Sequence, residues 1–155
     1  MIPLLLLLAS QEVAELPVAP DLPPPFRLGL VIGGPVGLTV ASSVFERVSV
    51  HGLLGHLGKE TGALLFALDA VYELPEIFGA IGDHGYTSTW FGAGLRYASG
   101  VEAQSATFGA RVPFGVSYFL RAAPIELFAS VAVGVNVVPE ADTVIDGGVG
   151  IRLGF

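Results

Sequence analysis

The chain has 155 residues, enough for one domain and short for two, and it contains no Cys, so disulfides and a Cys nucleophile are excluded. Hydrophobic residues make up 52% of the chain and charged residues only 14%, against about 25% in a soluble globular domain. The net charge of -7 excludes the basic surface that nucleic-acid binding needs, and the mean hydropathy of +0.71 indicates an apolar exterior.

The chain begins with an apolar segment. Residues 1–10 contain a run of Leu that is typical of the hydrophobic region of an export signal peptide, and the run is shorter than the ~20 residues of a membrane-spanning helix. Residues 11–25 end in three consecutive Pro and predict a linker without a fold of its own. We therefore expect residues 26–155 to form the folded domain.

From residue 26 onward, apolar side chains alternate with small or polar ones, which is the period of a β-strand with two unlike faces. The alternation is clearest in segments 108–120, 125–137 and 145–155, and every odd position from Ile125 to Val137 is apolar. Weaker alternation runs through five earlier segments: 26–33, 36–44, 48–57, 64–73 and 88–98. Turn residues separate these segments, so the sequence predicts eight antiparallel strands.

On each strand the positions that alternate with the apolar ones carry mostly small residues, many of them Gly. This composition indicates which face of the strands points into the barrel. A soluble barrel would carry many Lys and Glu side chains outside, whereas an outer-membrane barrel turns its apolar face to lipid and its polar face to the lumen. Several segments reach the ~9–11 residues that cross a bilayer. A membrane helix over 28–45 is disfavoured by Gly33, Gly34 and Pro35. We expect an all-β, eight-stranded, up-and-down transmembrane barrel in a bacterial outer membrane.

Strand parity assigns a balanced set of charged residues to the lumen. Buried charges need partners, so we expect a salt-bridge network that closes the interior. An eight-stranded barrel leaves room for side chains and little room for water, although a narrow channel stays an alternative. The predicted lumen set is Arg27, Asp69, Glu73, Arg96, Arg111, Glu126, Asp146 and Arg152.

Aromatic residues fall near the strand ends on the side of the chain termini. Interfacial aromatic belts are typical of such barrels, and we expect this belt to be periplasmic. The set is Phe26, Phe45, Tyr72, Phe91, Tyr118 and Phe155. The long connection 74–87 falls on the same side, and the connections at the opposite side are short, at 33–35, 58–62, 99–106 and 139–143.

Three groups of residues suggest a chemical site, and each also has a purely structural interpretation. Gly33, Gly34 and Gly37 lack the helix that a phosphate-binding loop requires. His51 and His56 differ in parity, so a shared metal ion is not expected. Ser49, His51 and Asp69 could form the Ser/His/acid arrangement of a lipid-modifying enzyme, which stays an alternative. We expect no catalytic residues, no metal and no cofactor.

Four sequence blocks carry a resemblance to a known family: GLVIGGPVGL at 29–38, GARVPFGVSYF at 109–119, APIELF at 123–128 and DGGVGIR at 146–152. They resemble the small outer-membrane barrels known best from spirochaetes, which are similar in fold to OmpX and to the membrane domain of OmpA. The resemblance implies an integral outer-membrane protein with a structural or surface-interaction role. Its expected partners are outer-membrane lipid and the barrel assembly machinery, which would read the terminal Phe155, and we expect a monomer.

Overall fold

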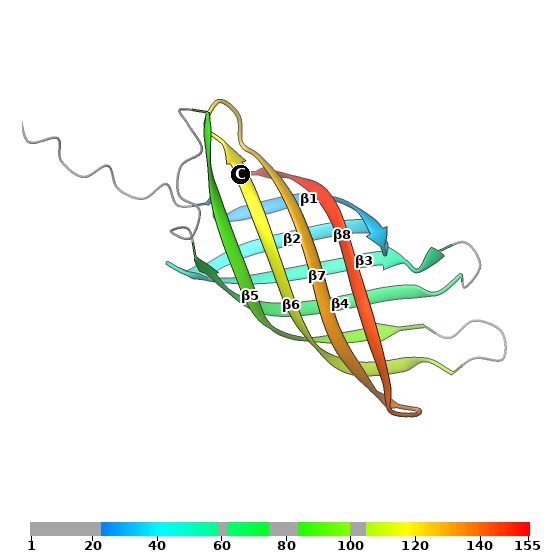
Figure 1. Ribbon diagram of the computed structural model, residues 1–155. Coiled ribbons are helices and arrows are strands. Elements are labelled where there is room, and N and C mark those ends of the chain that lie inside the picture. Colours follow the sequence, from blue (N-terminus) through cyan, green and yellow to red (C-terminus); the bar gives the residue numbers. More distant parts are fainter. Residues whose placement is uncertain (1–22, 59–61, 75–83, 100–104) are drawn as a thin grey trace, which may run out of the picture.

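The computed structural model describes residues 23–58, 62–74, 84–99 and 105–155, which form a closed barrel of eight antiparallel strands (Figure 1). Each strand pairs with its neighbour in sequence, and the last strand pairs with the first. The predicted all-β, eight-stranded, up-and-down antiparallel barrel is therefore confirmed. The strands are β1 (Phe26–Gly34), β2 (Val36–Phe45), β3 (Val48–His56), β4 (Leu64–Leu74), β5 (Gly85–Ala98), β6 (Thr107–Leu120), β7 (Ile125–Val138) and β8 (Asp142–Gly154).

Most predicted boundaries lie within a residue of those observed, and two are wrong. β5 begins at Gly85 and not at residue 88, and β8 begins at Asp142 and not at residue 145. Each extension begins with a residue of low strand propensity, Gly85 or Asp142, next to the turn residues by which the sequence delimited the segment. Pairing with a neighbouring strand overrides that preference: Gly85 pairs with Leu120, and Asp142 pairs with Asn136.

Residues 28–45, which were also considered as a membrane helix, fold as β1 and β2 with a turn at Pro35. The glycines at 33–37 therefore belong to a hairpin and not to a phosphate-binding loop. Within the described ranges, no helix has the length and apolar character needed to span a bilayer.

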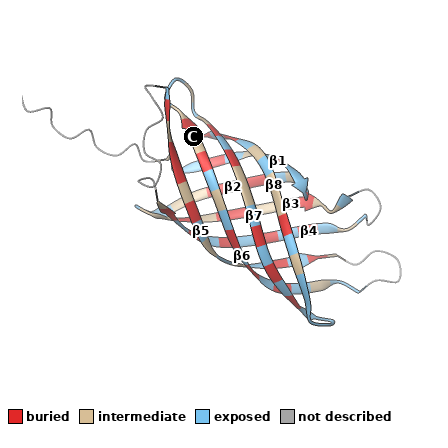
Figure 2. Cartoon of the chain, in the orientation of Figure 1, coloured by how far each residue is buried: buried red, intermediate tan, exposed pale blue. Residues whose placement is uncertain are grey.

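Burial alternates along most of the strands between the two faces of the barrel wall, as Figure 2 shows. In β4, for example, Leu65, Ala67 and Val71 are buried inside, whereas Phe66 and Leu68 are about half exposed outside. In the other strands the eight charged residues assigned to the lumen also point inward, and most Leu, Val, Ile and Phe side chains point outward. The burial pattern is thus the reverse of a water-soluble barrel.

The start of β1 and the end of β8 meet at one end of the barrel, called here the terminal end; the opposite end is the far end. At the terminal end the Phe155 amide donates to the Phe26 carbonyl at 2.8 Å, and the Ser43 amide donates to the Pro25 carbonyl at 2.9 Å. The last residues of the predicted linker 11–25 therefore pack on the barrel. The predicted signal peptide 1–10, most of that linker and most of the connection 74–87 lie outside the described residues.

Candidate functional site

The lumen of the barrel contains the buried charged and hydrogen-bonding side chains of the described residues, and it is therefore the candidate site. All eight charged side chains that the sequence assigned to it are at most 7% exposed, and each of them takes part in an ion pair. The ion pairs divide these residues into two groups at different depths. The first cluster is Arg27, Glu73, Glu126 and Arg152; the second cluster is Asp69, Arg96, Arg111 and Asp146.

The first cluster lies towards the terminal end and draws on β1, β4, β7 and β8. Arg27 Nη2 donates to Glu73 Oε1 at 2.7 Å, and its Nη1 lies 3.5 Å from Glu126 Oε2. Arg152 Nη1 donates to Glu126 Oε1 at 3.0 Å. Two guanidinium groups and two carboxylates therefore alternate across the lumen, and their formal charges cancel.

Neutral side chains extend the hydrogen bonding of this cluster to further strands. Ser49 donates to Glu73 Oε1 at 2.7 Å, and Ser117 donates to Glu126. Trp90 Nε1 donates to Ser117 Oγ at 3.1 Å, and Arg152 Nη2 donates to Thr39 Oγ1 at 3.0 Å. The carboxylates thus receive the extra donors that make a buried ion pair tolerable in a medium of low dielectric constant.

Aromatic rings cover the two guanidinium groups of the first cluster. The Arg152 guanidinium lies 4.0 Å from the centre of the Phe128 ring, and that of Arg27 lies 5.5 Å from the Phe119 ring. Phe119 in turn stacks on Tyr86 at 4.8 Å. Such cation–π contacts contribute about 0.5–2 kcal/mol each. The rings also fill the lumen around the charges.

The second cluster lies nearer the far end and draws on β4, β5, β6 and β8. Arg111 bridges two acids, with Nε 3.1 Å from Asp69 Oδ1 and Nη1 3.5 Å from Asp146 Oδ2. Arg96 Nε lies 3.3 Å from Asp146 Oδ2, and Arg96 also donates to Asn136. This cluster is formally neutral as well.

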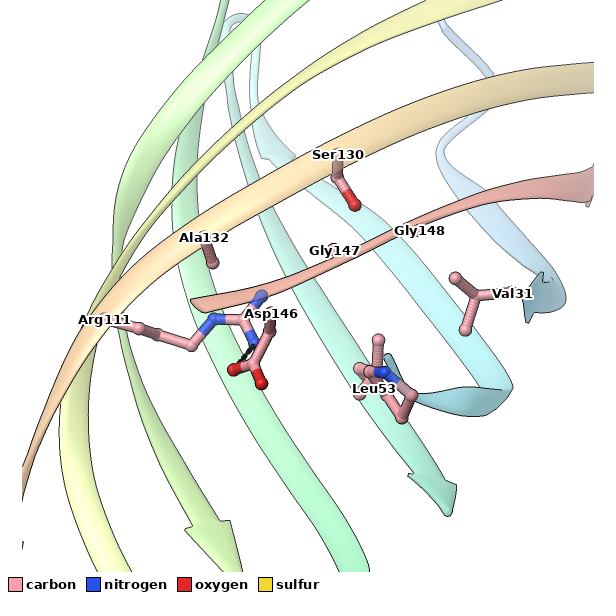
Figure 3. A pocket seen from close by; sticks show the side chains of 9 residues that line it. Val31, Leu53, Arg111, Ser130, Ala132, Asp146, Gly147 and Gly148 are labelled. Atoms are coloured by element: carbon pink, nitrogen blue, oxygen red, sulfur yellow. Dashed lines mark ion pairs between the residues drawn. The ribbon is translucent and has the colours of Figure 1, made fainter. Parts of the chain in front are cut away.

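A small cavity adjoins the second cluster. Figure 3 shows Arg111 and Asp146 on one side of it, and Val31 and Leu53 on the other. Its volume is about 10 Å³, which is room for about one water molecule. Ion pairs and small side chains thus fill the lumen here.

Ser49, His51 and Asp69 do not form the arrangement weighed from the sequence. All three are buried in the lumen, but Ser49 donates to Glu73, and Asp69 pairs with Arg111. The ring nitrogens of His51 have no hydrogen-bond partner; its Nε2 lies 3.9 Å from Glu73 Oε1, and its ring packs edge-on against Trp90. No serine hydroxyl is therefore presented to a histidine base at this position.

The described residues contain no group of three or more His, Cys, Asp and Glu side chains that could hold a metal ion. His51 faces the lumen and is buried, whereas His56, of opposite parity, is only partly buried. This agrees with the different faces expected from their spacing.

The exterior carries aromatic residues at two levels. Of the predicted terminal-end set, Tyr118 is partly buried and the other five, Phe26, Phe45, Tyr72, Phe91 and Phe155, are 39–72% exposed. Because β5 begins early, Phe91 lies in the middle of its strand, beside Tyr72. A second row near the far end was missed: Phe66, Tyr97 and Phe108 pair across β4, β5 and β6 and are 43–49% exposed.

Sequence reasoning also missed several neutral lumen residues that bond the charges. Parity alone could have assigned Thr39 and Ser117 to the inner face, but Ser and Thr are common on many surfaces; Ser49 was expected only as a member of the Ser/His/acid arrangement. Trp90 has the same parity as Arg96 in segment 88–98, which assigns it to the inner face, but parity was applied there to charged residues alone. Asn136 stood in the polar series of its segment and was not selected because it bears no charge.

No protein-family model matches the sequence, and neither a curated protein nor a solved structure matches it. The barrel architecture is consistent with the fold of OmpX and of the OmpA membrane domain. The narrower resemblance to spirochaete barrels has no support from these comparisons.

Proposed function

We propose that the protein is an integral outer-membrane β-barrel with a structural or surface-interaction role. The observation that carries the proposal is the inverted burial of the barrel: apolar side chains such as Leu30, Leu38 and Leu68 are 47–56% exposed outside, while ion pairs lie inside. In water that exterior would cost about 25 cal/mol for each Å² of apolar surface left in contact with solvent. In lipid the same exterior is favourable.

The strand lengths support a bilayer as the surrounding medium. The strands have 9–14 residues, and a tilted strand needs about 9–11 to cross the hydrocarbon core. Aromatic residues at both levels of the exterior are expected at the two membrane interfaces. In this proposal the terminal end faces the periplasm and the far end faces outward.

The lumen supports a closed barrel in preference to a pore. Each cluster is neutral and spans the interior between several strands, and the cavity beside the second cluster has room for about one water molecule. The role we propose therefore lies at the ends and on the outside of the barrel. Conductance in planar bilayers tests this point: stepwise currents from the wild-type protein would support the channel alternative instead.

The lipid-modifying alternative has a direct test as well. Membrane lipids of cells with the intact protein are compared with those of cells that carry Ser49→Ala or His51→Ala. We expect the same acyl composition in all three strains, because Ser49 binds Glu73 and is only 1% exposed. An acylated lipid that disappears with either substitution would favour the enzyme.

Refolding into detergent micelles tests the proposal as a whole. The full chain should show β-type circular dichroism, and unboiled samples should run at a shifted mobility on gels, as a closed barrel does. A chain that is soluble and monomeric without detergent would overturn the membrane proposal.

We also propose that the barrel is monomeric and that the assembly machinery of the outer membrane reads β8 and the exposed Phe155. Phe155→Ser should slow insertion into vesicles that contain that machinery, while spontaneous refolding into micelles stays unchanged. Equal slowing in both systems would assign Phe155 to folding rather than to recognition.

A further inference from the structure

The last strand of the barrel continues past the end of the first. β8 pairs with β7 from Leu153 to Asp142, but β1 ends at Gly34, opposite Gly147. The β8 residues 142–146 therefore have a partner strand on one side only. Figure 1 shows the β7–β8 hairpin projecting as a tip beyond the β1–β2 turn. The next residue after β1, Pro35, has no N–H with which to extend the pairing.

The hydrogen bonds at the end of β8 identify which backbone groups face this open edge. The Gly154 amide donates towards β7, to Pro124, and the Phe155 amide donates towards β1, to Phe26. The pairing of β8 with β7 and its pairing with β1 both run without a register shift. The backbone N–H and C=O groups of successive β8 residues therefore point alternately towards β7 and towards β1. The N–H and C=O groups of Thr143 and Ile145 consequently point away from β7 into the open edge.

No strand among the described residues pairs with this edge. Thr143 is exposed, and Ile145 is 73% exposed, more than any other large hydrophobic residue that the structure describes. A side chain added at Gly34, at the foot of the edge, would meet no atom within 4 Å. An unpaired row of backbone donors and acceptors of this kind is a template for an additional strand.

The charge of the hairpin favours a particular kind of partner. Glu140 and Asp142 are exposed at its tip, and residues 134–149 contain no Lys, Arg or His. A second copy of this chain on the same edge would bring two acidic tips together, and like charges on paired strands are destabilising. A basic strand would instead complement the tip.

We propose that the open edge of β8 at 142–146 binds an extended peptide segment of another protein by strand addition. The segment pairs its backbone with Thr143 and Ile145, presents an apolar side chain beside Ile145 and carries Lys or Arg next to Glu140 and Asp142. In the orientation proposed above, the acidic tip of the hairpin faces outward, and Thr143 lies nearer the outer surface than Ile145, whose partner on β7 is Val133. Strand addition depends only on the register of the barrel strands. If no peptide binds this edge, the proposal that the barrel spans a membrane is therefore unaffected.

Amide hydrogen exchange on the refolded full chain tests this inference, with a short synthetic peptide that alternates Val and Lys as the probe. Bound peptide should slow exchange of the Thr143 and Ile145 amides by about tenfold, which corresponds to about 1.4 kcal/mol. The Val144 amide, which faces β7, should not change. The same peptide with Pro at its centre is the control and should give no protection.

Two variants separate backbone pairing from charge attraction. Ile145→Pro removes one donor at the open edge without removing a bond to β7, and it should abolish protection of Thr143. Glu140→Gln with Asp142→Asn keeps the backbone and should weaken peptide binding about two- to fivefold. The inference is overturned by protection that falls elsewhere, by unchanged binding to Ile145→Pro, by no binding, or by a dimer of the free protein that Ile145→Pro dissociates.

Discussion

Arg27 and Glu73 lie 46 residues apart in sequence, and a 2.7 Å ion pair joins them across the barrel interior. The guanidinium comes from the first strand and the carboxylate from the fourth, so the contact forms only when both strands have their correct register in the closed barrel. Both side chains are at most 5% exposed. The pair therefore reports on the state of the whole barrel.

Breaking this pair should destabilise the barrel strongly. Glu73→Gln leaves the buried Arg27 charge with only the more distant Glu126, and removal of one partner of a buried pair costs about 3–5 kcal/mol. Urea unfolding of the refolded protein in micelles measures the loss. Glu140→Gln, at an exposed site, is the control and should change the free energy of unfolding by less than about 0.5 kcal/mol. A small effect of Glu73→Gln would mean that water reaches the first cluster.

The two ion-pair clusters should contribute independently to stability. Glu126 in the first cluster and Asp146 in the second pair with different arginines, so the losses of unfolding free energy caused by Glu126→Gln and Asp146→Asn should add within about 0.5 kcal/mol. Glu73→Gln and Glu126→Gln share Arg27 and should deviate from additivity by more. Double-mutant cycles in urea distinguish these outcomes, and strong coupling between the clusters would indicate one continuous network.

The period-two alternation of apolar residues predicted the eight strands and the inward direction of the charged side chains, because this alternation can be recognised from the sequence alone. It could not predict the pairing. Whether Arg27 meets Glu73 or Asp69 depends on the stagger of strands that are distant in sequence, and that stagger is fixed only when β8 closes on β1. The open edge at Thr143 was hidden for the same reason, since the early start of β8 comes from its pairing with β7.

Any side chain at position 115 should destabilise the protein, because the ring of Trp90 lies directly against Gly115. An added Cβ would lie 2.7 Å from the Cη2 atom of Trp90 and closer still to two other ring atoms. Gly115→Ala should therefore displace the ring, break its hydrogen bond to Ser117 and cost about 1–3 kcal/mol.

The chain contains one Trp, so its fluorescence follows this displacement without interference. We expect a shifted emission maximum for Gly115→Ala in the folded state. Gly34→Ala, at a position with no atom within 4 Å, is the matched control and should leave both emission and stability unchanged. Unaltered emission from Gly115→Ala would show that the Trp90 side chain has room to yield.

The membrane proposal predicts a depth-dependent cost for charge on the outer face of β7. Val131 lies near the middle of this strand and Val137 near its far end, and their side chains are 46% and 58% exposed. Val131→Arg should cost about 2–4 kcal/mol of folding free energy in lipid vesicles, and Val137→Arg about 0–1, because Arg at the bilayer centre cannot reach water. In both variants the lumen is untouched, so the difference reports on the surrounding medium. Urea titration in vesicles measures it, and equal small costs at the two positions would contradict placement of this face in hydrocarbon.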